Sequence, residues 1–252
     1  MGLFDLFASR EVKEQNTLRR MVKKVTEKYG PPENRQKAIE QLGQMGTPAA
    51  LAALCQRFTV RAEPGITDDE EKEAALRILV EAGQPARAPV QEFVRREESG
   101  VAWGLRALAG ISPAEHLTAF ALAELARLSR EYTRDPEKKL VLLHEAESLE
   151  DPRVAPTALP FLDDMADDVK IAGLRALAPR GYPDAREPML RLLTAPETAR
   201  RVQTAAIEAI ARSAFGVQGY REKVESLLPE PFFVDKAGIL KRRGAPAAGE
   251  SE

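Results

Sequence analysis

The hexapeptide GLRALA occurs twice in this chain of 252 residues, at positions 104–109 and 173–178. Degenerate copies of the same stretch begin at residues 38, 75, 142 and 206. The six copies therefore follow one another at intervals of about 34 residues, within the range of roughly 20 to 50 residues that is typical of stacked repeat units. The spacing predicts a chain of repeated supersecondary units.

Each copy carries the pattern of an amphipathic helix. Leu105 and Leu108 recur at three-residue spacing, as do Leu174 and Leu177, and alanine, which has the highest helix propensity, fills neighbouring positions. Proline is accepted in the first turn of a helix, because its missing N–H would have no intrahelical acceptor there. The sequence therefore predicts a second helix after five of the copies, beginning near Pro48, Pro85, Pro113, Pro152 and Pro183.

Three of these prolines follow a residue that commonly caps a helix N-terminus, namely Thr47, Ser112 or Asp151. A hairpin of two short helices cannot bury both of its apolar faces alone, whereas stacked hairpins can. We therefore predict an all-α fold, an α–α superhelix of about six helical hairpins with terminal capping helices. The repeat array is expected over residues 31–243, and residues 244–252 are expected to be a disordered tail.

The stretch 151–212 also matches a known repeat pattern. An Asp-Pro pair opens a leucine-rich helix, and the next helix follows with Asp168, Val169, Lys170, Ala172, Ala176 and Leu177. In these residues the chain resembles HEAT repeats, including the short bacterial form that phycobilin lyases also contain. The resemblance is weaker over 31–150 and absent at both ends. It implies a solenoid whose second helices line a concave side, but HEAT arrays serve many unrelated tasks, so it implies little about function.

Residues 1–30 are predicted to comprise an apolar tip and a basic amphipathic helix that caps the first repeat. Its apolar stripe consists of Leu18, Met21, Val22, Val25 and Tyr29. An apolar tip precedes this helix and consists of Leu3, Phe4, Leu6 and Phe7. An apolar tip followed by a basic helix is typical of peripheral membrane anchors, but the tip is equally able to fold onto the cap or to enter a groove of a partner.

The composition bears on the cellular compartment of the protein and on the class of partner that it binds. The formal net charge is −2, from 37 basic and 39 acidic side chains, which disfavours nucleic acid as a partner. The single cysteine, Cys55, lies on an apolar helical face and is predicted to be a buried hydrophobic residue in a reducing compartment. Arginine-rich and alanine-rich usage suggests a bacterial source. We expect a cytoplasmic protein, with a location at the inner membrane face as the alternative.

No catalytic, cofactor-binding or metal-binding residues are predicted. The two histidines, His116 and His144, are too few for the paired His-Glu metal sites of HEAT-built hydroxylases, and the single cysteine adds no zinc ligand set. No glycine-rich phosphate loop or nucleophile motif occurs. Trp103, at the start of one repeat helix, is expected to pack in the core, with exposure as an interaction anchor the alternative.

Arginine is the candidate partner-binding residue. Six arginines lie on or near the second helices opposite the apolar stripe, and the resemblance to HEAT repeats implies that they face one groove: Arg57, Arg87, Arg95, Arg127, Arg186 and Arg191. A solvated helix face is the alternative. Guanidinium groups bind carboxylates in forked geometry, so an acidic protein segment is the expected ligand. The predicted function is a non-enzymatic scaffold or adaptor. A membrane-associated scaffold held by residues 1–28 and a lyase-like enzyme or chaperone subunit are the alternatives.

Overall fold

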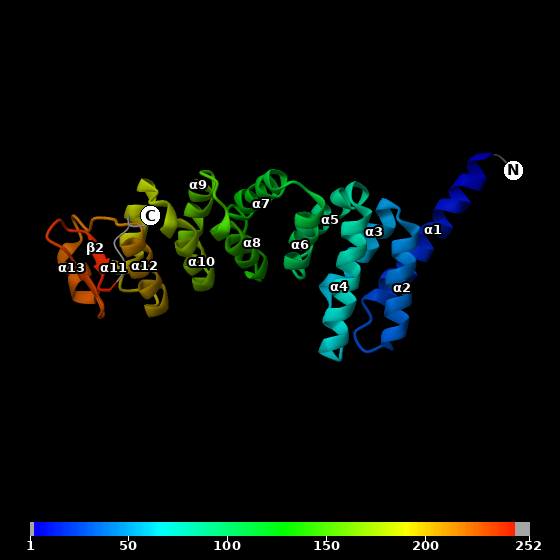
Figure 1. The fold of residues 1–252 in the computed structure, drawn as a ribbon, viewed down its shortest axis with the longest axis horizontal. Coiled ribbons are helices and arrows are strands. Elements are labelled where there is room, and N and C mark those ends of the chain that lie inside the picture. The colour runs from blue at the N-terminus through cyan, green and yellow to red at the C-terminus, as the bar shows by residue number, and fades with distance from the viewer. Residues whose placement is uncertain (1–2, 245–252) are drawn as a thin grey trace. The chain divides into compact units, whose positions relative to one another are not determined.

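The computed structural model describes the backbone of residues 3–244 and the side chains of residues 12–244. Within these limits the chain is helical apart from one short β-hairpin (Figure 1), which confirms the predicted all-α class. The chain divides into two compact units, Met1–Leu117 (unit 1) and Thr118–Glu252 (unit 2). Helix α7 (Ala114–Leu128) crosses this division.

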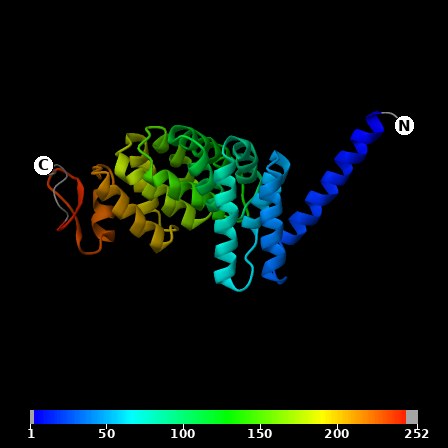
Figure 2. The same cartoon turned by 45° about the vertical axis from the view of Figure 1, so that its right-hand side comes forward.

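Unit 1 is a set of consecutive helical hairpins. Helix α4 packs against both α2 and α6, and α3 packs against α5, so first helices contact first helices and second helices contact second helices. Figure 2 shows α2 and α4 side by side. The elements of unit 1 are α1 (Leu3–Val25), α2 (Pro32–Met45), α3 (Pro48–Cys55), the 3-10 turn η1 (Gln56–Thr59), α4 (Gly65–Ala82), α5 (Gln84–Arg96) and α6 (Val101–Ile111).

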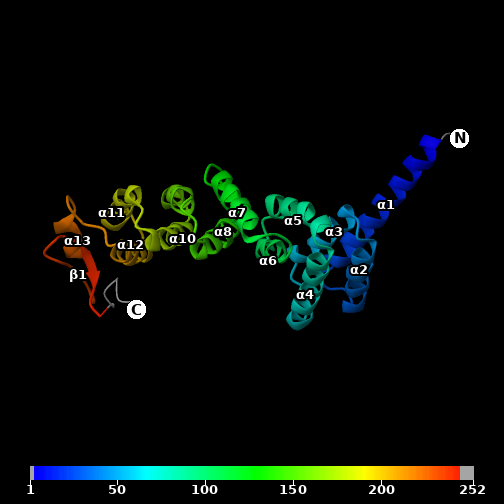
Figure 3. The same ribbon diagram turned by 45° about the horizontal axis from the view of Figure 1, so that its top comes forward.

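Unit 2 repeats this arrangement. Helix α10 packs against α8 on one side and α12 on the other, and this row can be followed in Figure 3. After α7 the elements are α8 (Glu137–Ser148), α9 (Val154–Ala158), η2 (Leu159–Asp163), α10 (Asp167–Leu177), η3 (Ala178–Arg180), η4 (Pro183–Ala185), α11 (Arg186–Thr194), α12 (Arg200–Arg212), α13 (Arg221–Leu227), β1 (Phe232–Val234) and β2 (Leu240–Arg242).

The six sequence copies coincide with the even-numbered helices. The copies that begin at residues 38, 75, 104, 142, 173 and 206 lie in α2, α4, α6, α8, α10 and α12. Pro48 and Pro85 occupy the first turns of α3 and α5, and Pro113 directly precedes α7. Thr47 caps α3 as predicted, because its hydroxyl oxygen accepts a hydrogen bond from the Ala50 N–H at 3.2 Å.

The glycine that begins each of the two GLRALA copies lies where two helices approach closely. Gly104 of α6 faces Phe93 and Val94 of α5, and a Cβ atom at this position would lie 2.6 Å from Val94 Cγ2. Gly173 of α10 faces Phe161 and Leu162 of η2, but a Cβ atom there would lie 3.4 Å from the nearest atoms. The two copies of GLRALA therefore pack on equivalent neighbours with different amounts of space.

Helix α1 packs on the first hairpin through α2, α3 and η1, and its N-terminal half extends beyond them (Figure 2). Val25 is completely buried, but Tyr29 is 80% exposed, because α1 ends at Val25 and Tyr29 follows in the turn. Tyr29 is therefore not part of the predicted apolar stripe. The side chains of Leu3, Phe4, Leu6 and Phe7, and residues 245–252 of the predicted tail, lie outside the described residues.

The C-terminal end is closed by strands rather than by the expected helix. Strands β1 and β2 pair in antiparallel register, with Phe232 opposite Arg242 and Val234 opposite Leu240. Leu240 is completely buried, since β2 packs on α12.

Candidate functional site

Arg57 does not belong to a binding surface, and the prediction for this residue was wrong. Its side chain is completely buried in unit 1, because the chain changes from α3 to the tighter turn η1 just before it. Arg57 Nη2 lies 2.5 Å from Asp68 Oδ1 and 2.9 Å from Glu71 Oε2. It is a core residue that links the first hairpin to α4.

Arg57 belongs to a buried ionic cluster of five side chains: Arg35, Arg57, Asp68, Glu71 and Lys72. Arg35 Nε lies 2.8 Å from Glu71 Oε2, and its Nη1 donates to the carbonyl oxygens of Glu27 and Gly30, so the cluster also fixes the turn after α1. Arg35 Nη2 and Glu71 Oε1 are buried without a hydrogen-bond partner among the described residues. Such a cluster fixes geometry more than it adds stability, because desolvation offsets much of the attraction.

Burial alone would raise the pKa of the Asp68 carboxyl. Hydrogen bonds from the Ala62 N–H, from Lys72 and from Arg57, together with the charge of Arg57, outweigh burial and lower this pKa below its ordinary 3.8. The carboxylate form of Asp68 is thus the form that the fold of unit 1 requires.

The remaining predicted arginines differ in exposure and belong to both units. Arg87 and Arg95 lie in unit 1, Arg87 half-buried and Arg95 exposed. Arg127 of unit 2 pairs with its own helix and the turn beyond, through Glu124 at 3.0 Å and Glu131 at 2.7 Å. A groove shared by the five arginines other than Arg57 stays a prediction.

Arg186 and Arg191 both belong to α11. Arg186 donates to the carbonyl oxygens of Gly216 and Gln218 at 2.8 and 2.7 Å, and so holds the segment after α12. Arg191 is exposed. Arg186 is therefore a structural residue as well as a partly exposed one, whereas Arg191 keeps the surface position that the sequence pattern predicts.

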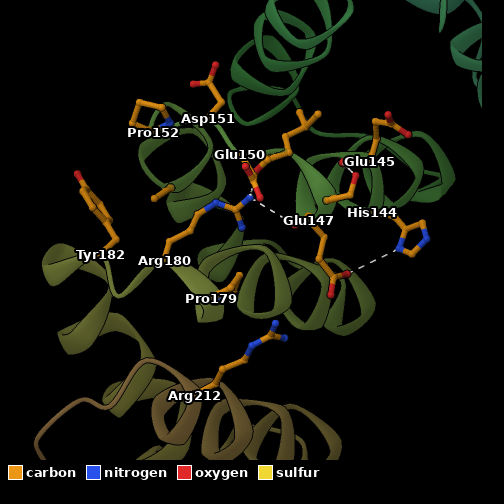
Figure 4. A pocket seen from close by; sticks show the side chains of 13 residues that line it. His144, Glu145, Glu147, Glu150, Asp151, Pro152, Pro179, Arg180, Tyr182 and Arg212 are labelled. Atoms are coloured by element: carbon orange, nitrogen blue, oxygen red, sulfur yellow. Dashed lines mark hydrogen bonds and ion pairs between the residues drawn. The ribbon is translucent and has the colours of Figure 1, made fainter. Parts of the chain in front are cut away.

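The cavity that offers the most recognition chemistry lies in unit 2. It has a volume of about 930 Å³ and lies where α8, the turn after α10 and the end of α12 meet (Figure 4). Its lining residues are His144, Glu145, Glu147, Ser148, Leu149, Glu150, Asp151, Pro152, Ala155, Pro179, Arg180, Tyr182 and Arg212. The volume is in the range of about 300 to 1,000 Å³ that is common for ligand sites.

Arg180 forms the middle of the cavity. Its Nη2 donates to the carbonyl oxygens of Ala146, at 3.0 Å, and of Leu149, and its Nη1 donates to the carbonyl oxygen of Ala176. These carbonyls lie at the ends of α8 and α10, where carbonyl groups run short of helical donors, although that of Ala146 also accepts from the Leu149 N–H at 3.2 Å. Burial lowers the pKa of Arg180, with nearby Arg212 adding to this effect and Glu147 opposing it.

Ser213 makes the corresponding contact one repeat later. Its hydroxyl donates to the carbonyl oxygen of Ala178 at 3.0 Å, so it joins the end of α12 to the end of α10. Arg180 and Ser213 both lie seven residues after the start of their repeat copies, at 173 and 206. One position of the repeat therefore connects successive first helices at the cavity edge of unit 2.

The α8 side of the cavity carries carboxylates. Glu147 lies 3.7 Å from His144 Nδ1, whereas the carboxylates of Glu145 and Glu150 have no hydrogen bond or ion pair with another described residue. Asp151 is held by Arg153, whose side-chain and backbone hydrogen bonds lower the pKa of the Asp151 carboxyl to about 2. Two glutamates on this side are thus available to a ligand.

The α12 side carries a guanidinium group. Arg212 ends α12 and is exposed, and no ion pair or hydrogen bond joins its side chain to another residue within 12–244. Tyr182 is half-buried beside the cavity, and its hydroxyl group lies 3.0 Å from Asp184 Oδ2. Arg212 is therefore free to bind a carboxylate in the forked geometry that guanidinium groups favour.

These groups are suited to ionic and hydrogen-bonding recognition. The sequence patterns did not identify the cavity, since its residues come from helix ends that are 68 residues apart, from 144 to 212. One sequence signal points to the cavity. Seven residues after the start of the repeat copy at 173, the charged residue Arg180 interrupts an otherwise apolar stretch. Among the predicted site residues, none of the six arginines lines this cavity.

Cys55 and Trp103 both have packing roles in unit 1. Cys55 is completely buried, which raises the pKa of its thiol to about 12 despite an opposing backbone hydrogen bond. Trp103 is half-buried and stacks on Phe58 with ring centroids 5.7 Å apart, while Arg106 covers it at 4.4 Å. These findings agree with the predicted packing roles of Cys55 and Trp103.

His116 and His144 are both exposed, and only His144 lines the cavity. Within the described part of the chain, no group of three or more histidine, cysteine, aspartate or glutamate side chains is placed to hold a metal ion. None of the helices described is long and apolar enough to pass through a bilayer. Comparison with known proteins gave no match to a protein-family model, to a curated protein or to a solved structure.

Proposed function

We propose that this protein is a non-enzymatic helical-repeat scaffold that binds a segment of a partner protein, and that the cavity of unit 2 is the binding site. The observation that carries the proposal is the set of unpaired charges around this cavity, Glu145, Glu150 and Arg212, beside the half-buried ring of Tyr182. Tyrosine and arginine are enriched in protein interfaces, and carboxylates without a partner are able to bind basic groups of a ligand in charge-assisted hydrogen bonds.

The arrangement of helices supports the same proposal. The cavity is open along the ends of three first helices, so a ligand can lie across α8, α10 and α12 at once. Stacked hairpins present extended surfaces of this kind. As part of the proposal, we assign the chain to HEAT-like repeat proteins of the bacterial cytoplasm, on the basis of its repeat pattern and its single buried cysteine.

Site-specific photocrosslinking in the native cell tests the proposal. Tyr182 is replaced in the full chain by p-benzoylphenylalanine, and the same replacement at Tyr132, which is 80% exposed and outside the cavity, is the control. We expect one partner protein to be crosslinked from position 182 and not from position 132. Equal crosslinking from both positions, or none from position 182, would refute the proposed binding site.

A further inference from the structure

The two sides of the unit 2 cavity carry opposite charges. Helix α10 packs between α8 and α12, so it separates the residues that these two helices contribute. Glu145 and Glu150 come from α8 and the turn after it, whereas Arg212 comes from the end of α12. In Figure 4, Arg212 lies at the bottom of the view, apart from Glu145 and Glu150 at the top, and the side chain of Glu147 lies between them. A ligand that satisfies both sides must itself carry two charges of opposite sign.

The middle of the cavity offers no unpaired charge to a ligand. The guanidinium group of Arg180 is already surrounded by main-chain carbonyls of α8 and α10. Around it lie Leu149, Pro152, Pro179 and the ring of Tyr182, which favour uncharged ligand groups. Along the row of helix ends, the charges available to a ligand are therefore negative at α8 and positive at α12, and the charge of Arg180 between them is already bonded to main-chain carbonyls.

We infer that the cavity binds an extended protein segment that carries a carboxylate and a basic group about six residues apart. The carboxylate binds Arg212, and the basic group binds Glu150 with support from Glu145. Neighbouring helices pack about 8 to 10 Å apart, so α8 and α12 are separated by about 20 Å. An extended chain rises about 3.3 Å per residue and covers this distance in about six residues. The inference rests on the proposed function, because it specifies the segment that the cavity binds.

Two unlabelled peptides of identical composition test the spacing. Each is a nine-residue glycine-serine peptide with one glutamate and one lysine, at the second and eighth positions in the first peptide and at adjacent central positions in the second. Both orders of the two charges are used. Titration of the ¹⁵N-labelled full chain, followed by amide chemical shifts, gives the dissociation constant and the location. We expect the separated charges to bind at least fivefold more tightly than the adjacent ones, with shifts at residues 144–151, 179–182 and 212.

Charge-neutralising variants test the two ends independently. Arg212→Gln and Glu150→Gln are each expected to weaken binding of the separated peptide about tenfold and to leave the affinity for the adjacent peptide nearly unchanged. The matched controls are Arg200→Gln and Glu208→Gln, which remove the same charges from exposed positions of α12 outside the cavity. The controls are expected to bind both peptides as the unmodified chain does.

The inference is overturned by equal affinity for the two peptides, by shifts outside the cavity, or by equal effects of cavity and control variants. These outcomes are separable from failure of the proposed function, which the crosslinking experiment measures. A partner that is crosslinked from position 182 through a segment without an acidic and a basic residue about six positions apart would keep the proposed function and refute this inference.

Discussion

The two copies of GLRALA allow one substitution to be compared at equivalent positions. Gly104→Ala and Gly173→Ala place the same methyl group in the interior of α6 and α10. In a helix interior, alanine is more stable than glycine by about 1 kcal/mol, and this gain is common to both variants. The difference between them comes from the space that the new Cβ atom finds.

At position 104 the Cβ atom would lie 2.6 Å from Val94 Cγ2 and 3.1 Å from Phe93 Cδ1, and both neighbours are buried. Overpacking of a buried site costs about 1 to 3 kcal/mol, so the net change is a loss of about 1 kcal/mol. At position 173 the nearest atoms, of Leu162 and Phe161, are 3.4 Å away, which is ordinary contact. Gly173→Ala should therefore stabilise unit 2 by up to about 1 kcal/mol.

Fluorescence-detected urea unfolding measures the change in unit 1, and amide hydrogen exchange measures the change in unit 2. The chain has one tryptophan, Trp103, which lies in unit 1 beside Gly104, so its fluorescence follows unit 1. Amide hydrogen exchange of peptides from α10, read by mass spectrometry, follows unit 2. We expect a lower fluorescence midpoint for Gly104→Ala and slower exchange in α10 for Gly173→Ala. Stabilisation of similar size in both variants would refute the argument from helix approach.

Three further predictions concern unit 1. Glu71→Gln should destabilise unit 1 by about 3 kcal/mol, because it leaves two buried arginines without their shared carboxylate, whereas Glu73→Gln, on the surface, should change the urea midpoint little. The lowered pKa of Asp68 contributes stability above its ordinary value of 3.8, so the fluorescence-detected stability of unit 1 should decline as the pH falls below about 4, and Asp68→Asn should flatten this decline. The thiol of Cys55, with its pKa raised to about 12, should not react with iodoacetamide at pH 8 until urea unfolds unit 1; rapid labelling of the native chain would contradict its burial.

Helical periodicity predicted the elements well because apolar spacing and proline position are local properties of the chain. Each of the six copies lies in a helix, and Pro48 and Pro85 lie in the first turns of the helices that follow. Capping was less predictable. Ser112 was expected to cap α7, but it follows the end of α6, and its buried hydroxyl has no hydrogen-bond partner among the described residues. Serine is suited both to the position after α6 and to the position before α7, so in so short a connection the residue type does not decide between them.

The site was less predictable than the fold because it depends on contacts between distant helices. Arg57 was placed on the surface by assuming that α3 continues, yet the 3-10 turn after Cys55 changes the direction of the side chains that follow. Its partners, Asp68 and Glu71, lie in the next hairpin. The cavity of unit 2 likewise depends on which helix ends meet, and periodicity alone does not contain that information.

The hydrogen bonds from Arg180 to the end of α8 also affect the order in which unit 2 folds during synthesis. The carbonyl groups of Ala146 and Leu149 leave the ribosome 34 and 31 residues before the guanidinium group that binds them. Until then, water must solvate the carbonyl group of Leu149, whereas that of Ala146 already accepts from the Leu149 N–H. The hairpin that α8 begins is therefore completed only when the following hairpin is being made, and a nascent chain that stops before Arg180 exposes an unfinished edge to chaperones and proteases.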